Sequence, residues 1–244
     1  MELKGKTAFV TGGARRIGRS ISLRLARGGA NVVVNYHSSN KDAESLLAEI
    51  SRLGAKGIAL QGDISIARDV DGMVANAVKE FGSIDILVNN AGIYPKTPFD
   101  KLTEQDWDTT LNTNLKGPFL CAKAVGDLML KGRGGKIINI ADWAGIRPYV
   151  DYIPYCVSKA GVIALTKALA ITLAPKVQVN AIAPGPIMLP DDLSDTERVE
   201  VFAKTPLKRI GSPDDVAETV AFLIQGSDFI TGAVIPVDGG RLIA

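Results

Sequence analysis

The sequence Thr7-Ala-Phe-Val-Thr-Gly-Gly-Ala-Arg-Arg-Ile-Gly18 decides the predicted fold. Its first part, Thr7 to Val10, is a short apolar run typical of a buried strand, and it ends in a Thr-Gly-Gly turn. A helical pattern follows from about Arg16 to Arg27, and its apolar face carries Ile17, Ile21 and Leu25. A buried strand joined through a glycine turn to an amphipathic helix is the repeating unit of alternating α/β folds.

The same alternation continues along the whole chain. Apolar runs predict further strands at 32–34, 57–60, 86–88, 136–140, 177–182 and 234–237. Helical patterns lie between them at 42–53, 67–81, 103–131, 155–174 and 212–224, and Gly117 with Pro118 is expected to bend the third of these. The strands are continuously apolar, as in a parallel sheet covered on both faces. We therefore predict one α/β domain over residues 1–244.

The composition excludes several classes of protein. With 28 basic and 26 acidic residues, the net charge of +2 predicts no strong attraction to nucleic acid or to an anionic membrane. The two cysteines, Cys121 and Cys156, lack metal-ligand spacing and fit a reducing compartment. We find neither a signal peptide nor a run of about 18 apolar residues, so we expect a cytoplasmic protein with a small-molecule substrate.

Polar and glycine-rich segments follow the predicted strands. They are Thr11-Gly-Gly, Asn89-Asn-Ala-Gly, Asp142 and Pro184-Gly-Pro. The carboxyl ends of parallel strands meet at one edge of a sheet, and ligands of such sheets bind beyond that edge. The sequence therefore predicts a ligand site there.

The segment Thr11 to Gly18 has the features of a phosphate-binding turn. Its glycines let backbone N–H groups approach a pyrophosphate, and the following helix N-terminus adds positive potential. A tight strand-to-helix turn also requires glycine, so the glycines alone leave both interpretations open. Arg15 and Arg16 lie where a phosphate would bind, and guanidinium groups suit phosphate.

The segment after the second strand bears on the choice of dinucleotide. It reads Asn35-Tyr-His-Ser-Ser39 and lacks the acid that usually binds the ribose 2′-hydroxyl of NAD. Arg15, His37, Ser38 and Ser39 can instead receive a 2′-phosphate, which predicts NADP(H) as the cofactor. His37 is the only histidine, so we expect no metal site and no histidine-based triad.

Three polar residues can meet at the mouth of the sheet. Tyr155 and Lys159 are four positions apart and share one face if 155–174 is a helix. Asp142 comes just after the strand at 136–140. Taken alone, a Tyr-x-x-x-Lys pair favours a surface tyrosine and a solvated lysine, so the other motifs decide.

These motifs occur in a fixed order. They are Thr11-Gly12…Gly18, Asn89-Asn-Ala-Gly92, Asn114 in Asn-Leu-Lys-Gly, Tyr155-x-x-x-Lys159, Pro184-Gly-Pro and Asp238-Gly-Gly. Together they resemble the short-chain dehydrogenase/reductase family over essentially the whole chain. The resemblance implies a single Rossmann-like α/β domain with a seven-stranded parallel sheet of order 3-2-1-4-5-6-7, helices on both faces, and assembly as a homotetramer.

The resemblance also implies roles for individual residues. Tyr155 would be the proton donor, Lys159 would bind the nicotinamide ribose and lower the tyrosine pKa, and Asn114 would support a water-linked proton path. A free tyrosine titrates near pH ~10, and a nearby cation moves that pKa toward neutrality. Besides Tyr155 and Lys159, the implied NADP-binding residues are Gly12, Arg15, Arg16, Ile17, Gly18, Tyr36, His37, Ser38, Asp63, Ile64, Asn90, Ala91, Gly92, Pro184, Gly185 and Ile187.

The sequence departs from the family pattern at two positions. Arg16 replaces the middle glycine of the turn, and Asp142 replaces the serine thirteen residues before the tyrosine. Both departures resemble the pteridine reductase branch, in which an aromatic residue such as Tyr94 stacks on the pterin. The Tyr36-His-Ser segment also resembles the NADPH turn of that branch, although Ser38 replaces an arginine. The expected substrate-binding residues are Arg16, Tyr94, Asp142, Trp143, Tyr149 and Met188.

The chemistry of Asp142 supports a particular substrate. A serine can donate a hydrogen bond to a developing oxyanion, whereas an ionised carboxylate repels it. A pterin offers N–H donors and an imine nitrogen, so we expect NADPH-dependent reduction of a pterin-like C=N bond. The alternative is a carbonyl reductase, such as a 3-oxoacyl-(acyl-carrier-protein) reductase or a ketone or sugar dehydrogenase. A non-catalytic nucleotide sensor of the same fold is a third hypothesis, although Asn114, Tyr155 and Lys159 oppose it.

A further segment, at about 188–210, is acidic and poorly patterned. It can be a solvated loop or a mobile lid over the substrate. We favour a lid because the segment follows the sixth strand on the expected ligand side.

Overall fold

The computed structural model describes residues 1–189 and 193–244. It contains one seven-stranded sheet of order β3-β2-β1-β4-β5-β6-β7 in which neighbouring strands are parallel. The strands are β1 (Thr7–Val10), β2 (Asn31–Tyr36), β3 (Gly57–Gln61), β4 (Ile86–Asn89), β5 (Gly135–Ile140), β6 (Val177–Pro184) and β7 (Val234–Val237). The predicted fold class and strand order are confirmed.

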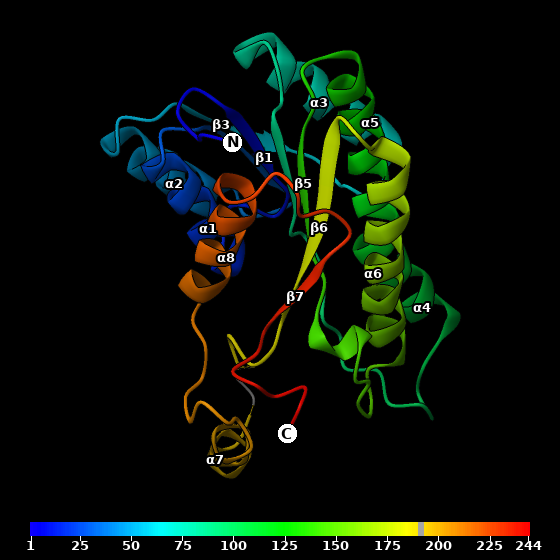
Figure 1. Ribbon diagram of the computed structural model, residues 1–244. Coiled ribbons are helices and arrows are strands. Elements are labelled where there is room, and N and C mark those ends of the chain that lie inside the picture. Colours follow the sequence, from blue (N-terminus) through cyan, green and yellow to red (C-terminus); the bar gives the residue numbers. More distant parts are fainter. Residues whose placement is uncertain (190–192) are drawn as a thin grey trace.

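Helices cover both faces of the sheet (Figure 1). One face carries α1 (Arg16–Arg27), α2 (Asn40–Arg52) and α8 (Pro213–Gln225), and the other carries α3 (Ala67–Phe81), α5 (Gly117–Lys131) and α6 (Ile153–Leu173). In β1, Ala8 and Val10 join the core under the first group, and Phe9 joins the core under the second. This period of two explains why a strand buried on both faces is apolar throughout.

The long helical region after Thr103 is interrupted by a π-helical turn. Its predicted capping box forms, since the Thr103 hydroxyl accepts from the Asp106 N–H at 3.2 Å. The helix α4 (Glu104–Leu111) then passes into π-helical η1 (Asn112–Lys116) before α5 begins. The expected irregularity is therefore present just before Gly117 and Pro118, because proline has no N–H to continue the ladder. A π turn often marks a functional position, and this one contains Asn114.

The region 188–210 contains a helix that the sequence pattern did not reveal. Helix α7 (Asp195–Ala203) begins with a capping box in which the Ser194 hydroxyl accepts from the Glu197 N–H at 3.3 Å. None of its residues is buried, so it lacks the apolar face by which helices are recognised. Its acidic first turn is favourable at a helix N-terminus. Residues 190–192 of the expected lid lie outside the described residues.

Helix α6 is, by length and composition alone, apolar enough to cross a membrane. It packs against β5 and β6, and it buries Tyr155 and Lys159 near its start. We attribute its apolar character to this packing within the α/β core.

Candidate active site

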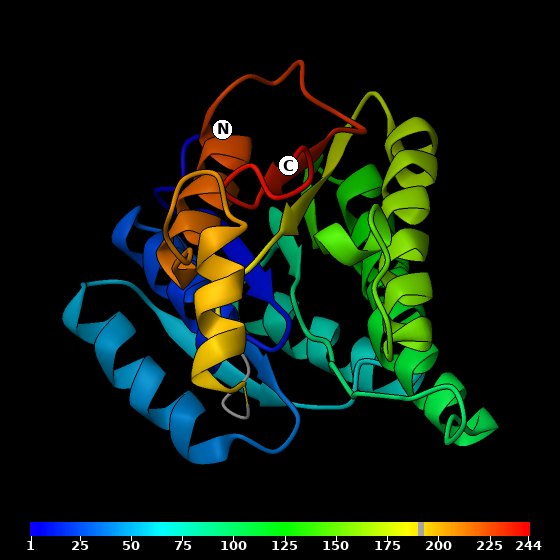
Figure 2. The ribbon, with the colours of Figure 1, turned by 90° about the horizontal axis from the view of Figure 1, so that it is seen from below.

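The candidate site lies at the carboxyl edge of the sheet, where the segments after β1, β4, β5 and β6 come together. Figure 2 looks at the molecule from this end and shows α7 and the C-terminal segment there. Helix α6 also begins at this edge, since it follows the short 3-10 helix η2 (Trp143–Gly145) that comes after β5.

Asp142 and Tyr155 are directly hydrogen-bonded. The Tyr155 hydroxyl donates to Oδ2 of Asp142 at 2.9 Å. Oδ1 of Asp142 accepts from the Ala144 N–H at 2.8 Å, because Asp142 is the N-cap of η2. Burial raises the pKa of Asp142, while these hydrogen bonds and the charge of Lys159 oppose that rise. The carboxyl group is thus held by its own loop and aimed at the phenol.

Lys159 is buried beside this pair. Its Nζ donates to the Ile140 carbonyl at 2.9 Å and lies 5.7 Å from the centre of the Tyr155 ring. Burial lowers the pKa of Lys159, and the nearby Asp142 carboxylate raises it in part. The spacing of four residues thus places the side chains of Tyr155 and Lys159 together at the carboxyl edge of the sheet.

The expected effect of Lys159 on Tyr155 is not what the structure shows. Burial, and then the charge and hydrogen bond of Asp142, raise the pKa of Tyr155 well above its usual value. The carboxylate accepts the phenolic hydrogen bond directly, whereas the ammonium is turned to a backbone carbonyl. In this arrangement the phenol keeps its proton, which is the form required of a proton donor.

Asn114 links two of the predicted motifs. Its Oδ1 accepts from the Ile93 N–H at 2.8 Å, and its Nδ2 donates to the Ile93 carbonyl at 2.9 Å and to the Ser158 hydroxyl at 3.2 Å. It therefore fixes the chain after Asn89-Asn-Ala-Gly92 against α6, one residue before Lys159. The Asn114 side chain is buried.

The glycine turn is shaped by close backbone packing. Gly12 has a φ of +58°, and a Cβ there would lie 2.9 Å from the Ala91 Cα. The Asn90 amide donates to the carbonyls of Thr11 and Gly12 at 2.9 and 3.1 Å, which ties this turn to the segment after β4. Arg16 has a φ of +52°, a left-handed conformation that is rare for a residue with a side chain.

Asn35 is a site residue that the sequence interpretation missed. Its Oδ1 accepts from the Gly12 N–H at 3.1 Å, and its Nδ2 donates to the Gly62 carbonyl at 3.0 Å. The side chain is buried at the end of β2 and joins the glycine turn to the segment that contains Asp63. The sequence did offer one signal for Asn35, because it directly follows the apolar run Val32-Val-Val. An amide in a buried strand requires hydrogen-bond partners, which here belong to the site.

The described residues at the nucleotide end fit a dinucleotide. Helix α1 has no side-chain cap and no acidic residue in its first turn, so its N-terminal N–H groups and positive potential suit a pyrophosphate. Arg15 lies on the surface 3.6 Å from the Asp42 carboxylate, and His37 and Ser38 are exposed nearby. The remaining predicted residues end β2 or β6, or lie in the segments after β1, β3, β4 and β6 at the same edge. They are Ile17, Gly18, Tyr36, Asp63, Ile64, Ala91, Gly92, Pro184, Gly185 and Ile187.

Aromatic rings extend from Tyr155 along one side of the site. The Tyr94 ring meets the Tyr155 ring edge-on at 4.6 Å and stacks on Tyr152 at 4.4 Å. Tyr149 lies 5.3 Å from Tyr152 and 5.7 Å from Trp143. We call Tyr94, Tyr152, Tyr149 and Trp143 the aromatic wall. Of the other expected substrate residues, Arg16 begins α1 and Met188 follows β6, and both are exposed.

Taken together, a Rossmann-like sheet and a Tyr–Lys pair beyond β5 define an NAD(P)-dependent oxidoreductase. A family model described as enoyl-(acyl carrier protein) reductase matches residues 12–241. The chain belongs to the short-chain dehydrogenase/reductase family.

Relatives from two kinds of enzyme resemble the chain along nearly its full length. The 3-oxoacyl-(acyl-carrier-protein) reductase FabG of Staphylococcus aureus is 43% identical over 239 residues, which cover 96% of this chain and 97% of that protein. The (2S)-((R)-hydroxy(phenyl)methyl)succinyl-CoA dehydrogenase subunit BbsD of Thauera aromatica is 41% identical and covers 99% of this chain and 98% of its own.

A solved structure of an oxidoreductase has the same fold over nearly the whole chain. It is a 7α-hydroxysteroid dehydrogenase complexed with NADH and 7-oxo-glycochenodeoxycholic acid, with a TM-score of 0.94, 31% identity and coverage of 98% of this chain and 95% of that one. The relatives favour the carbonyl-reductase alternative over the pterin reductase that we expected first.

Proposed function

We propose that the chain is an NADPH-dependent reductase of the ketone in a 3-oxoacyl thioester. The observation that carries the proposal is the Tyr155 phenol, bonded to Asp142 and lying beside the buried Lys159 side chain at the carboxyl edge of the sheet. The identity to FabG supports the thioester as substrate class.

The cofactor proposal rests on the nucleotide end. The N-terminus of α1 would hold the pyrophosphate, and Arg15 with Tyr36, His37 and Ser38 would receive the 2′-phosphate. NADPH would supply the hydride when bound. No acid follows β2 to hydrogen-bond a free ribose 2′-hydroxyl, which favours NADPH over NADH.

The protein residues supply the proton and hold it in place. Tyr155 donates its hydroxyl proton to the carbonyl oxygen, and Lys159 stabilises the resulting phenolate and binds the cofactor ribose. Asn114 positions the segment after β4 and supports the proton path. Asp142 replaces a serine, and it has to be neutral or turned away when an oxyanion develops next to it. Its raised pKa reduces the cost of the neutral form.

Asp142 also supports a second candidate function, the reduction of a pterin-like C=N bond. A carboxylate can accept the N–H groups of a pterin, and Tyr94 offers a ring beside Tyr155 on which a flat substrate can stack. Arg16 is the second departure that favours this candidate.

Side-by-side assays separate the two candidates. NADPH consumption is measured with acetoacetyl-CoA and with dihydrobiopterin, in the parent enzyme and in Asp142→Ser. We expect turnover of the thioester in both proteins, with a higher kcat in Asp142→Ser because serine donates to the oxyanion. Turnover of dihydrobiopterin alone, abolished in Asp142→Ser, would establish the second candidate and refute the first.

Other features of the assembled protein are proposals from the same resemblance. The region 188–210, including α7, would act as a substrate lid. The protein would be a cytoplasmic homotetramer. An apolar groove formed by α4, η1, α5 and α6 supports an assembly. It is lined by Leu111, Asn112, Leu115, Lys116, Phe119 and Leu165.

A further inference from the structure

We propose that Asn139 and Thr166 are positioning residues for the reaction. Their hydrogen bond fixes where α6 lies along β5, and it thereby keeps the Lys159 ammonium on the Ile140 carbonyl. The inference rests on the proposed function, because Lys159 serves the same proton transfer. Neither Asn139 nor Thr166 belongs to the motifs that carry the family resemblance.

A chain of directed hydrogen bonds crosses the core from β4 to α6. Nδ2 of Asn89 donates to Oδ1 of Asn139 at 2.9 Å, and Nδ2 of Asn139 donates to the Thr166 hydroxyl at 2.9 Å. That hydroxyl donates in turn to the Val162 carbonyl, one helical turn earlier, at 2.8 Å. All three polar side chains are buried. The bonds therefore tie the ends of β4 and β5 to the middle of α6.

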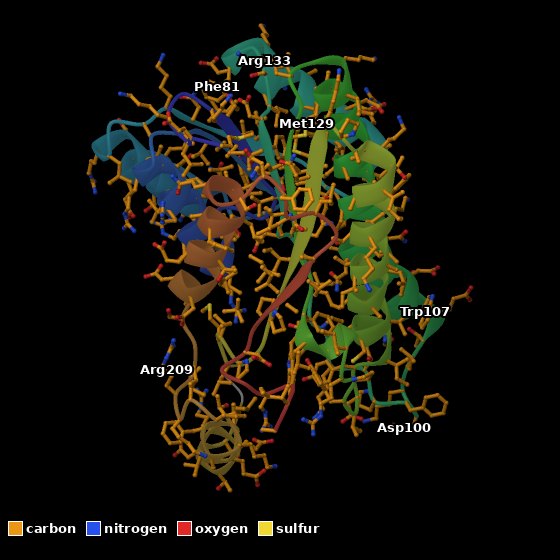
Figure 3. All side chains as sticks on the ribbon, in the orientation of Figure 1. Phe81, Asp100, Trp107, Met129, Arg133 and Arg209 are labelled. Atoms are coloured by element: carbon orange, nitrogen blue, oxygen red, sulfur yellow. The ribbon has the colours of Figure 1, made fainter. Side chains whose placement is uncertain are left out.

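Stability alone does not explain this network. A buried polar side chain costs free energy unless its donors and acceptors are paired. Within residues 1–189 and 193–244, Oδ1 of Asn89 is buried and accepts no hydrogen bond. Two positions earlier on the same strands, Leu87 and Ile137 lie in an apolar core that also contains Met129 of α5 (Figure 3). An apolar residue at position 139 would extend this core, so the Asn139 amide indicates a requirement for a bond of fixed direction.

The Asn139–Thr166 bond lies close to the catalytic lysine along both elements. Asn139 and Ile140 are consecutive in β5, and Lys159 and Thr166 are two turns apart on the buried face of α6. Helix α6 is thus joined to β5 at two points, by the Asn139–Thr166 bond in the core and by the Lys159–Ile140 bond at 2.9 Å. Because backbone hydrogen bonds make a helix stiff, a shift at Thr166 is passed on to Lys159.

The protonation of Lys159 depends on this alignment. The titratable groups that face it are Asp142, just after β5, and Tyr155 on the preceding turn of α6. Burial lowers the pKa of Lys159, and the Asp142 carboxylate offsets part of that shift. A carbonyl that accepts from an ammonium also favours the charged form. If α6 moves away from Ile140, the pKa of Lys159 should therefore fall further.

Substitutions at position 166 test the proposal in the complete enzyme. Thr166→Val keeps the shape of the side chain and removes the hydroxyl, whereas Thr166→Ser keeps the hydroxyl. With NADPH and acetoacetyl-CoA, we expect Thr166→Val to lower kcat about tenfold and to leave KM for the thioester unchanged. The fall of kcat at high pH, where Lys159 loses its proton, should begin at a lower pH. Thr166→Ser should retain the kcat and the pH profile of the parent.

Thr172→Val is the matched control. Thr172 lies on the same helix, and its hydroxyl likewise donates to the carbonyl four positions earlier, that of Ala168, at 2.8 Å. Its side chain is exposed, so the substitution should change neither kcat nor the pH profile. Equal effects of Thr166→Val and Thr172→Val would overturn the proposal, and so would a loss that Thr166→Ser shares.

A double-mutant cycle separates positioning from a general loss of stability. Asn139→Leu removes the other partner, and the double variant leaves neither group of the bond unpaired, which limits the cost in stability. If the two residues act through their common bond, kcat of the double variant equals that of Asn139→Leu. Losses that multiply would show two independent effects and refute the proposal. If a single variant does not fold, the kcat of the double variant is compared with that of Thr172→Val instead, and equal values refute the proposal.

Carbon NMR of labelled lysine Cε gives a measurement without cofactor or substrate. The Lys159 signal is assigned by its loss in Lys159→Met and is titrated with pH in the parent, Thr166→Val and Thr172→Val. We expect a lower pKa of Lys159 in Thr166→Val alone, and an identical pKa in all three proteins overturns the positioning role. A lowered pKa without any thioester turnover by the parent refutes the proposed function alone. Thioester turnover that Thr166→Val leaves unchanged refutes the positioning role alone.

Discussion

Arg16 has a backbone conformation that is costly for any residue other than glycine. Arg16 is the first residue of α1 and has a φ of +52°. At this φ the Cβ of an L-residue crowds the following carbonyl oxygen, which costs about 1–2 kcal/mol. The side chain is exposed, so its packing does not compensate for this strain. A strained residue next to the predicted pyrophosphate site suggests a binding role for its guanidinium.

We therefore predict that Arg16→Gly stabilises the protein without cofactor. The relief of backbone strain exceeds the conformational entropy that a glycine loses on folding. The free energy of unfolding should therefore rise by about 0.5–1 kcal/mol, which is roughly 1–4 °C in Tm for a domain of this size. Thermal unfolding measures the change. The control is Arg27→Gly at the other end of α1, where φ is not positive and glycine should destabilise. Equal losses in both variants would contradict the prediction.

Arg15 bears on cofactor choice. Its guanidinium is exposed and only loosely paired with Asp42, at 3.6 Å, so it is available to a 2′-phosphate. We predict that the parent binds NADPH more tightly than NADH and that Arg15→Ala reduces this preference about tenfold. Fluorescence titration with both cofactors measures it. Equal affinities of the parent for the two cofactors would disprove the assignment to NADPH.

At the scale of the element, the N-terminus of α8 combines a capping box with an ion pair. Asp215 accepts from the Ser212 N–H at 2.7 Å, while Arg209 donates to both carboxylate oxygens at 2.8 Å. The hydrogen bond from Arg209 is the main reason why the pKa of Asp215 lies well below its usual range. The charged carboxylate therefore stabilises the fold.

The pH dependence of the stability that Asp215 contributes follows from the direction of its pKa shift. A lowered folded-state pKa gives stability that is fully present above the unfolded pKa, near ~4, and is lost as the pH falls through the folded-state value. Asp215→Asn should cost roughly 1 kcal/mol at pH 7, because solvent screens this partly exposed pair. Urea unfolding should show the same cost down to about pH 4 and a smaller one below. Asp214→Asn, an exposed neighbour outside the capping box, is the control, and an equal cost there would contradict the assignment.

At the scale of the whole molecule, one side of the protein exposes apolar residues that the core does not use. Phe119 is 46% exposed and lines the groove with Leu111, Leu115 and Leu165, while Ile171 on α6 is 82% exposed. An apolar patch of this kind is typical of a surface that binds another protein chain. It supports the homotetramer that the family resemblance implies.

We predict that Phe119→Glu reduces the assembled mass, because an unpaired carboxylate would be buried in the interface. Light scattering coupled to gel filtration measures the mass against multiples of the 25.8 kDa chain. Leu53→Glu, at the end of α2 on the other face of the sheet, should have no effect. A parent protein that elutes as a single chain would contradict the tetramer.

The sequence by itself determined the order of the strands, and of the helices that cover the sheet, and it indicated the sheet edge where the candidate site lies. Continuous apolar runs, such as Thr7 to Val10, specify buried parallel strands because both faces of such strands are covered. The spacing of Tyr155 and Lys159 placed both on one helical face, since one turn of a helix repeats every 3.6 residues. These are local properties, and a pattern of neighbouring residues is enough to reveal them.

Only the tertiary structure decided which groups become partners. It turned Lys159 toward the Ile140 carbonyl, left Tyr155 bonded to Asp142, and raised the phenol pKa where we expected a decrease. It also placed Arg241 on Trp143, from distant parts of the chain. Burial and long-range contacts set these charges and hydrogen bonds, and they exist only once the strands and helices have packed together.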